Sequence, residues 1–401
     1  MLYQVLQFTT SFEFRIGILI TILACFIIIF ICRWSDYLLP QFVCKKFKQF
    51  SGETKVCTPQ ISIVIPSLNQ TQELAEHIEE LLNQDYPNYE VIIVEESKNE
   101  ETKDLIKSLT EKYKHLRHTF TPQSSKNICK RKLSITLGVR AARGEWVVVT
   151  TPDCHPLSNQ WLTTLSRSFT KETSVVCGYA NYDESSPNRV MYSRLRNSLM
   201  GLKASLLNLA FAGDICNFSF RKADFIQIGG FANSLHVTCG EAEMLVAALS
   251  QKGHIKFCCD KLGAVIEKYP GDVVQTMSDI VRRETLRHCG FYSMLFLFRE
   301  GLATSMLYIS YILIILGWCI FTMKWIHLGM YDYHDIYIDI MLLYLTIQHF
   351  ICPIILLNKC TAYMGEKQIG VFAVYWDIVL PFRNLYLKIK RWQLRNDFKL
   401  N

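Results

Sequence analysis

Three clusters of polar residues each follow a short apolar run in the sequence. These clusters occupy positions 67–70, 95–97 and 151–153. The second and third supply the carboxylates of Glu95, Glu96 and Asp153. A carboxylate at the end of a central strand is suited to hold a divalent cation, and such a cation can neutralise a diphosphate leaving group. The pattern therefore predicts a metal-assisted site for a nucleoside diphosphate.

Several other kinds of site are not expected. Neither G-x-G-x-x-G nor G-x-x-x-x-G-K-[ST] occurs in the chain, which argues against a Rossmann dehydrogenase and a P-loop ATPase. The 15 cysteines are scattered, and only Cys258 and Cys259 lie close together in the sequence. This spacing is typical neither of a zinc site nor of an extracellular disulfide framework, so we expect reduced thiols in a cytosolic compartment.

The polar clusters follow segments that alternate between strand and helix patterns. Strands are predicted over 61–65, 89–94 and 146–150, and helices over 73–82, 102–113 and 134–142. Apolar runs that alternate with helix-period stretches are typical of a parallel α/β sheet. In such an open sheet, ligands bind at the carboxyl ends of the strands. We therefore expect one α/β domain over 60–298, with the polar clusters at its ligand-binding edge.

Three further segments are long and apolar enough to cross a bilayer. They run over 16–32, 301–323 and 340–358, and charged residues bracket each of them. The composition agrees, because 50% of the 401 residues are hydrophobic and the mean hydropathy is +0.14. A cleaved signal peptide is the alternative for the first segment, but Glu13 and Arg15 precede it and no small-x-small site follows. We expect an N-terminal anchor and a C-terminal helical hairpin.

Basic residues set the expected orientation of these segments. Lysine and arginine are frequent in the linker 33–59 and in the tail 359–401, so both belong on the cytoplasmic side. Residues 1–15 and the loop 327–339 then lie outside the cytoplasm. The tail interleaves aromatic and basic residues, as in an amphipathic segment on a membrane surface. Membrane flanks thus account for the net charge of +7, and nucleic acid is not an expected partner.

Several motifs follow one another in order along the segment between the apolar spans. I-S-I-V-I-P-S-L-N-Q, E-V-I-I-V-E-E-S and W-V-V-V-T-T-P-D-C-H-P are followed by N-F-S-F-R-K, G-G-F, G-E-A-E and R-E-T-L-R-H. In this order they resemble the family 2 glycosyltransferases of the GT-A fold, a Rossmann-like α/β fold, and in particular membrane-anchored bacterial members. The resemblance implies inverting transfer of a sugar from a nucleotide-diphospho-sugar, with Mg²⁺ or Mn²⁺ as cofactor. It also implies a lipid-linked or polysaccharide acceptor at the cytoplasmic face of the inner (cell) membrane, beside other glycan-assembly proteins.

The resemblance also assigns roles to individual residues. The residues implied for nucleotide-sugar binding are Pro66, Ser67, Asn69, Glu95, Glu96, Lys132 and Asp153. Asp153 is in addition the implied metal ligand, and Arg283 and Arg287 are implied to contact the diphosphate or the acceptor. Glu241 and Glu243 are the two candidates for the catalytic base.

Four positions depart from the family pattern: Thr151 in D-x-D, Ala242 at the catalytic aspartate, and Glu284 and His288 in Q-x-x-R-W. Loss of a general base costs about 10²- to 10⁴-fold in rate. The alternative function is therefore a catalytically impaired GT-A subunit that binds nucleotide-sugar or scaffolds a glycan-assembly complex. Each of these residues also has an interpretation without a catalytic or binding role. Asp153 would cap a turn, and the two glutamates would favour the start of a helix. The two arginines would lie on a solvated or headgroup-facing surface.

Overall fold

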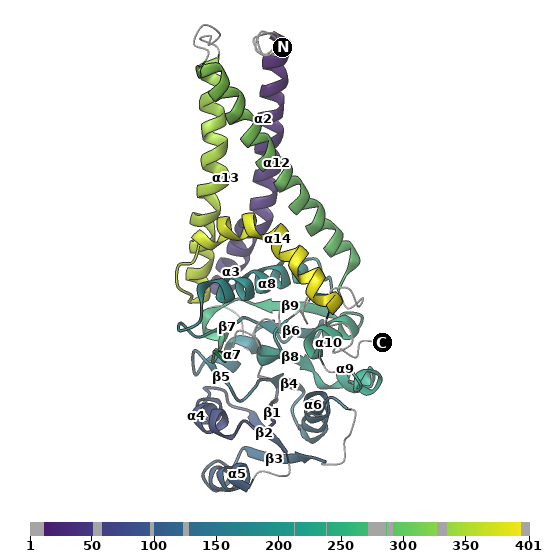
Figure 1. Cartoon of the computed structure of the whole chain (residues 1–401). Coiled ribbons are helices and arrows are strands. Elements are labelled where there is room, and N and C mark those ends of the chain that lie inside the picture. The colour runs from purple at the N-terminus through teal and green to yellow at the C-terminus, as the bar shows by residue number, and fades with distance from the viewer. Residues whose placement is uncertain are drawn as a thin grey trace.

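A computed structural model of the chain describes residues 12–50, 58–96, 100–122, 128–211, 213–237, 239–271, 286, 292–326 and 335–393. Figure 1 shows that the molecule has two parts, a set of long helices at one end and an α/β domain at the other. The chain enters through the long helices, forms the α/β domain, and then returns to the same end of the molecule.

A seven-stranded sheet forms the centre of the α/β domain, in the order β3-β2-β1-β4-β8-β6-β9. Its strands are β1 (Ile61–Ser67), β2 (Tyr89–Glu96), β3 (Leu116–Thr121), β4 (Trp146–Val149), β6 (Thr173–Gly178), β8 (Phe218–Arg221) and β9 (His254–Cys258). Strands β3, β2, β1 and β4 are parallel, which confirms the predicted parallel sheet for this half. Strand β8 runs antiparallel to both β4 and β6, so the complete sheet is mixed.

A second, three-stranded sheet lies beside the carboxyl end of β4. It has the order β5-β10-β7, with β5 at Cys154–Pro156, β10 at Val265–Glu267 and β7 at Ala180–Tyr182. Strands β5 and β10 are antiparallel, and their register pairs Cys154 with Glu267. This pairing brings a residue from the end of the domain next to the turn that follows β4.

Helices cover the main sheet on both faces. They are α4 (Thr71–Leu82), α5 (Glu100–Lys112), α6 (Lys130–Ala141), α7 (Trp161–Ser166), α8 (Asn188–Leu206), α9 (Lys222–Gln227) and α10 (Glu241–Leu249). Alternate residues of a strand point to opposite faces. Accordingly, Ile63 of β1 packs in the core that contains α4, whereas its neighbour Val64 packs in the core that contains α6 and α8. Burial on both faces explains why the central strands are apolar runs rather than alternating patterns.

A buried carboxylate joins the start of β1, β2 and β3. Glu90 accepts hydrogen bonds from the Ser62 hydroxyl at 2.7 Å, from the backbone N–H of Arg143 at 2.6 Å and from Arg117 at 2.9 Å. Burial by itself raises the pKa of Glu90, but these hydrogen bonds outweigh it and hold the pKa below the usual value. The folded state therefore favours the charged carboxylate.

This arrangement predicts a loss of stability in acid. Because the pKa of Glu90 is lower in the folded than in the unfolded chain, its contribution is complete above the unfolded value, about pH 4.3. It is lost as the pH falls through the folded value, because the unfolded chain binds the proton first. Glu90→Gln should cost about 1–3 kcal/mol of unfolding free energy at pH 7. Thermal melts should then show a smaller difference from the wild type as the pH falls below 4.3.

Glu111→Gln is the matched control, because Glu111 is exposed on α5. It should leave the melting temperature close to that of the wild type at each pH. A Glu90→Gln variant with an unchanged melting temperature at pH 7 would contradict the stabilising role of the buried carboxylate.

The long helices are α2 (Phe12–Arg33), α12 (Met294–Ile326) and α13 (Asp335–Met364). The five-residue π-helix η1 (Trp34–Leu38) and the helix α3 (Leu39–Phe50) continue α2. Three segments are long and apolar enough to cross a membrane: Ile16–Val43, Met294–Ile326 and Ile336–Met364. The spans expected from the sequence all lie within them. Cys25 and Ile29 of α2 pack in one small cluster with Ile314 of α12 and Leu345 of α13.

The helix α14 (Val371–Gln393) lies between these long helices and the α/β domain (Figure 1, yellow). Trp376 and Leu380 on its inner face are buried in the core that also contains α8. Its outer face exposes large apolar side chains, among them Ile378 and Phe382. The helix occupies the middle of the tail that the sequence predicts to be amphipathic, whereas residues 359–364 still belong to α13.

A buried ion pair network attaches the α/β domain to the long helices. Lys203 of α8 is 3% exposed, and its ammonium group lies 2.8 Å from Asp36 of η1 and 2.6 Å from Glu300 of α12. An ammonium group held by two carboxylates from separate elements fixes those elements relative to one another. Helix α8 therefore contacts the long helices directly, and its other residues reach toward the cavity described next.

Candidate active site

A polar cavity of about 380 Å³ opens at the carboxyl end of β4. Its lining combines the turn after β4, the first turns of α6 and α10, one side of α8 and the end of β10. The charged side chains that line it are Arg131, Asp153, Arg194, Asp214, Glu241, Glu243 and Glu267. Carboxylates thus outnumber basic groups on its walls, which suits the cavity to a cation and to polar, hydroxyl-bearing ligands.

Asp153 lies in the short turn between β4 and β5. The turn is held by the backbone N–H of Lys268, which donates to the Asp153 carbonyl at 2.9 Å. The Thr151 hydroxyl lies 3.0 Å from the Cys154 sulfur and fixes the other side of the turn. The backbone of Asp153 is thereby held by both sheets, and its side chain lines the cavity.

The start of α10 places two further carboxylates in the same cavity. Gly240 caps this helix with φ = 83°, a left-handed conformation that favours glycine. A Cβ atom at Gly240 would also lie only 2.8 Å from Leu286, so this position has little space for a side chain. Glu241 and Glu243 stand in the first helical turn, where the helix dipole favours negative charge. The structure thus brings Asp153, Glu241 and Glu243 together across a long stretch of sequence.

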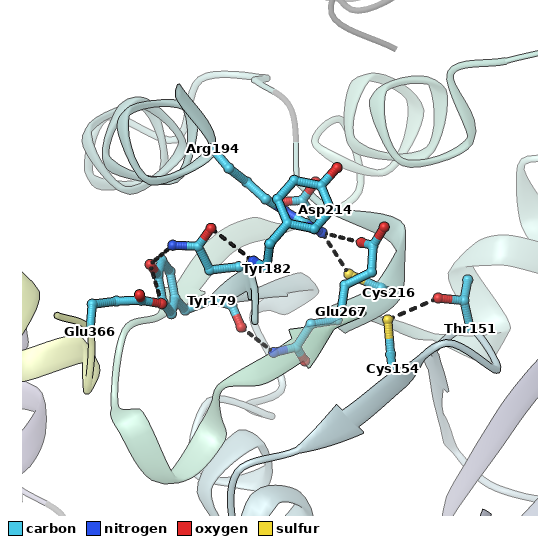
Figure 2. Close-up of polar contacts among 11 residues, drawn as sticks. Thr151, Cys154, Tyr179, Tyr182, Arg194, Asp214, Cys216, Glu267 and Glu366 are labelled. Atoms are coloured by element: carbon cyan, nitrogen blue, oxygen red, sulfur yellow. Dashed lines mark hydrogen bonds and ion pairs between the residues drawn. The ribbon is translucent and has the colours of Figure 1, made fainter. Parts of the chain in front are cut away.

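Arg194 of α8 organises the inner wall of the cavity (Figure 2). Its side chain is 3% exposed, and its guanidinium lies 3.3 Å from Asp214, 2.6 Å from Glu267 and 3.2 Å from the Cys216 sulfur. The ring of Tyr182 lies 4.3 Å from the guanidinium carbon. Burial raises the pKa of Glu267, the charge of Arg194 opposes that shift, and the nearby carboxylate of Asp153 adds to it.

The match to a family model covers the first part of this domain. Residues 62–229 match the model described as Glycosyl transferase family 2. These residues form a family 2 glycosyltransferase domain. The matched segment runs from β1 through α9 and includes Asp153, whereas α10 with its two glutamates lies beyond it. The mixed α/β sheet agrees with the GT-A fold expected from the sequence.

The known proteins to which this chain is similar include two glycosyltransferases. Glycosyltransferase GlyG of Streptococcus pneumoniae is 27% identical over 133 residues, which are 33% of this chain and 43% of that protein. A Methanococcus voltae protein, the dolichyl N-acetyl-alpha-D-glucosaminyl phosphate 3-beta-D-2,3-diacetamido-2,3-dideoxy-beta-D-glucuronosyltransferase, is 31% identical over 100 residues, 24% of this chain and 30% of that protein. The matches thus span less than half the length of either relative.

Among solved structures, the mannosyltransferase PcManGT of Pyrobaculum calidifontis, in complex with GDP-Man and Mn²⁺, is similar with a TM-score of 0.48. It is 15% identical in sequence, and the superposition covers 81% of this chain and 97% of that chain.

The residues expected to bind the nucleotide lie in different parts of the glycosyltransferase domain. Pro66 and Ser67 are buried at the end of β1, and the exposed Asn69 adopts a left-handed backbone with φ = 57°. Glu95 is buried at the end of β2 and lines a second cavity of about 410 Å³, together with Lys103 and others. Burial raises the pKa of Glu95. The structure therefore separates Glu95 from the cavity that contains Asp153.

Lys132 does not reach the cavity of the glycosyltransferase domain. Its side chain is fully buried, and its ammonium group lies 3.1 Å from the Ser234 carbonyl oxygen and 3.1 Å from the Met244 sulfur. Burial lowers the pKa of Lys132. The neighbouring Arg131 lines the cavity instead. The side chain of Glu96, and Arg283 and Arg287, lie outside the described residues.

The sequence did not indicate Arg194, Asp214 or Glu267 as site residues. Arg194 lies on a helix, Asp214 lies in a loop, and Glu267 ends a strand of only three residues, so no motif marks them. No fixed spacing in the sequence connects Asp153 to any of these three residues. Only the pairing of β5 with β10 places Glu267 beside the turn that carries Asp153.

The cavity contains groups that fit a divalent cation. Asp153 supplies a carboxylate at the end of a central strand, and Glu267 supplies a second one close enough to influence it electrostatically. Two neighbouring carboxylates repel each other, and a cation between them or beside them would relieve that repulsion. These carboxylates fit the Mg²⁺ or Mn²⁺ that the resemblance implies, with Asp153 in the last position of D-x-D and Thr151 in the first.

Proposed function

We propose that the protein is a membrane-bound inverting glycosyltransferase that moves a sugar from a nucleotide-diphospho-sugar to an acceptor at the cytoplasmic face of the membrane. One observation carries this proposal. Asp153 of the family 2 segment and the two glutamates of α10 line one cavity of about 380 Å³ at the carboxyl end of β4. This reaction requires one carboxylate that binds a metal ion and a second carboxylate that acts as a general base, and the cavity has both kinds of group.

The reaction needs a group that removes the proton of the acceptor hydroxyl. Glu241 is proposed as this base, since its side chain is partly exposed in the cavity. Glu243 is more deeply buried, at 9% exposure, and is the second candidate. The acceptor oxygen then attacks the anomeric carbon as the bond from that carbon to the diphosphate breaks, so that the configuration inverts.

Asp153 is proposed to orient the diphosphate end of the donor. When bound there, Mg²⁺ or Mn²⁺ would neutralise the negative charge that develops on the leaving nucleoside diphosphate. Arg131 lines the same cavity and is a further donor of hydrogen bonds to phosphate oxygens. Lys132 is too deeply buried to take this role, because its ammonium group already contacts Ser234 and Met244.

The acceptor is proposed to be lipid-linked or a growing polysaccharide. Three helices are long and apolar enough to cross a membrane, and Lys203 ties the domain to two of these membrane-side segments. The cavity is therefore held at a fixed position relative to the bilayer. The name of the Methanococcus voltae relative specifies a sugar carried on dolichyl phosphate, which supports a lipid-linked acceptor.

Release of nucleoside diphosphate by the detergent-purified chain tests the proposal. The donors are UDP-, GDP- and dTDP-sugars, the acceptor is a membrane-lipid extract, and parallel reactions contain Mn²⁺ or EDTA. We expect metal-dependent release with at least one donor, and its loss in Asp153→Asn. Asp85→Asn, a change at an exposed position, is the matched control and should retain the activity. Equal release by Asp153→Asn and the control would contradict the role of Asp153.

The second candidate function is a non-catalytic subunit that binds nucleotide-sugar or scaffolds a glycan-assembly complex. It is favoured by Ala242, which occupies the position of the family's catalytic aspartate and is 2% exposed. Metal-dependent binding of a donor, measured by calorimetry, without turnover of any donor would support this function over the transferase.

A further inference from the structure

Two thiols and a carboxylate meet at the inner end of the cavity (Figure 2). One ligand atom each from Cys154, Cys216 and Glu267 lie within 4.8 Å of one another. The three residues come from β5, from the 3₁₀-helix η2 (Ile215–Asn217) and from β10, so only the tertiary structure assembles them. Both cysteines are buried, and all three residues line the cavity or adjoin residues that do.

The separations are compatible with one bound cation. In a tetrahedral zinc site, Zn–S distances are about 2.3 Å and Zn–O distances about 2.0–2.2 Å, which puts neighbouring ligand atoms roughly 3.5–3.8 Å apart. Ligand atoms within 4.8 Å of one another therefore need to come closer together by at most about 1.0–1.3 Å to reach that spacing. A fourth ligand is near, because a carboxylate oxygen of Asp153 lies 3.7 Å from the Cys154 sulfur.

Arg194 does not block this group of ligands. It donates to one carboxylate oxygen of Glu267 at 2.6 Å, which leaves the second oxygen for a cation. It also donates to the Cys216 sulfur at 3.2 Å. A hydrogen bond to a metal-bound thiolate or carboxylate orients the ligand, as outer partners commonly do in metal sites.

The charge of the cavity also stays balanced. Thiols bind metal as thiolates, so each ligand sulfur gives up a proton when the cation enters. A divalent cation that replaces two thiol protons leaves the net charge unchanged, and the pairing of Arg194 with Asp214 and Glu267 is retained. The exchange therefore does not require the cavity to hold an additional buried charge.

We propose that Cys154, Cys216 and Glu267 form a binding site for a thiophilic divalent cation of the Zn²⁺ class. Thiolates favour such cations, whereas Mg²⁺ and Mn²⁺ prefer oxygen ligands. This site thus differs from an oxygen-only site at Asp153 by its two sulfur ligands, although both sites draw on the carboxylates of Glu267 and Asp153. The proposal does not depend on turnover, because it concerns the protein without donor or acceptor.

Titration of the detergent-purified, phosphine-reduced full chain with Co²⁺ tests the proposal. We expect absorption bands from thiolate-to-cobalt charge transfer in the near ultraviolet, and intense visible bands from tetrahedral cobalt. The bands should saturate near one Co²⁺ per chain, with two protons released per Co²⁺ in weakly buffered solution, and Zn²⁺ should abolish them. No nucleotide-sugar is present, so the result is independent of any failure to detect sugar transfer.

Cys154→Ser and Cys216→Ser should each lose most of the charge-transfer absorption. Cys258→Ser is the matched control, because Cys258 is also fully buried and belongs to the same hydrophobic core as Cys154 and Cys216, but it is not one of the three residues whose ligand atoms lie within 4.8 Å of one another. Thermal melts establish that the variants are folded, and Cys154→Ala replaces the serine variant if that one is not. Retention of the thiolate bands in both cysteine variants, or their absence from the reduced wild type, would overturn the proposal.

Discussion

Replacement of Glu241 by glutamine is expected to lower the rate of sugar transfer by about 10²- to 10⁴-fold. Glutamine has nearly the same shape as glutamate but cannot accept the proton of an acceptor hydroxyl. Glu241 stands at the first position of α10, is partly exposed, and lines the cavity that also holds Asp153. The measurement is the release of nucleoside diphosphate at saturating donor and acceptor, so that kcat rather than binding is compared.

Glu243→Gln is the matched comparison, since it makes the same change two residues along the same helix. Glu243 is 9% exposed and is expected to lose less than about tenfold in rate. Donor binding, measured by calorimetry, should remain within a few-fold of the wild type in both variants. The assignment of the base would be wrong if Glu243→Gln lost the activity and Glu241→Gln retained it.

Removal of the Arg194 side chain is expected to have the largest effect on stability. Arg194→Met retains much of the side-chain length but removes the guanidinium that pairs with the carboxylates of Asp214 and Glu267. The side chains of these two residues are 6% and 21% exposed. Loss of one member of a buried ion pair costs about 3–5 kcal/mol, because the remaining charge stays desolvated. For a domain of this size, the apparent melting temperature should fall by roughly 10 °C.

Arg189→Met is the control for this prediction, because Arg189 is exposed near the start of the same helix. Its melting temperature should stay within about 2 °C of the wild type. Arg194→Lys should lie between the two, since lysine keeps the charge but cannot form the same forked hydrogen bonds. Equal melting temperatures for Arg194→Met and the wild type would show that the carboxylates are neutralised by other means.

The central strands could be predicted because their own residues are nearly all apolar, as expected for strands that are buried on both faces. Strands β1, β2 and β4 are covered by helices on both faces, and such strands appear as short apolar runs. The edge strand β3 could not be predicted in this way. It reads Leu-Arg-His-Thr-Phe-Thr, and only its first and last residues are buried. Strand β3 is stabilised mainly by its pairing with β2, so the hydrophobic pattern of its own residues is weak.

The antiparallel part of the sheet was also beyond local patterns. Strand β8 has four residues, and the three strands of the small sheet have three residues each. A segment of this length shows too few alternations to distinguish a strand from a loop. The direction of β8 follows from its pairing with β4 and β6, and the directions of the small-sheet strands follow from their pairing with one another, which are properties of the assembled sheets.

The sequence by itself determined the apolar helices that can span a membrane, the parallel half of the sheet, and the candidate carboxylates Asp153, Glu241 and Glu243. These features depend on local composition or on the end of a strand or helix, so the residues that cause them are neighbours in the chain.

Only the tertiary structure decided which carboxylates share a cavity with Asp153, that Lys132 is buried outside it, and that Arg194, Asp214 and Glu267 complete its wall. It also brought Cys154 and Cys216 together. These contacts join residues far apart in the sequence through the register of β5 with β10 and the packing of α8. Such contacts depend on how whole elements pair and pack, and no single segment of sequence contains that information.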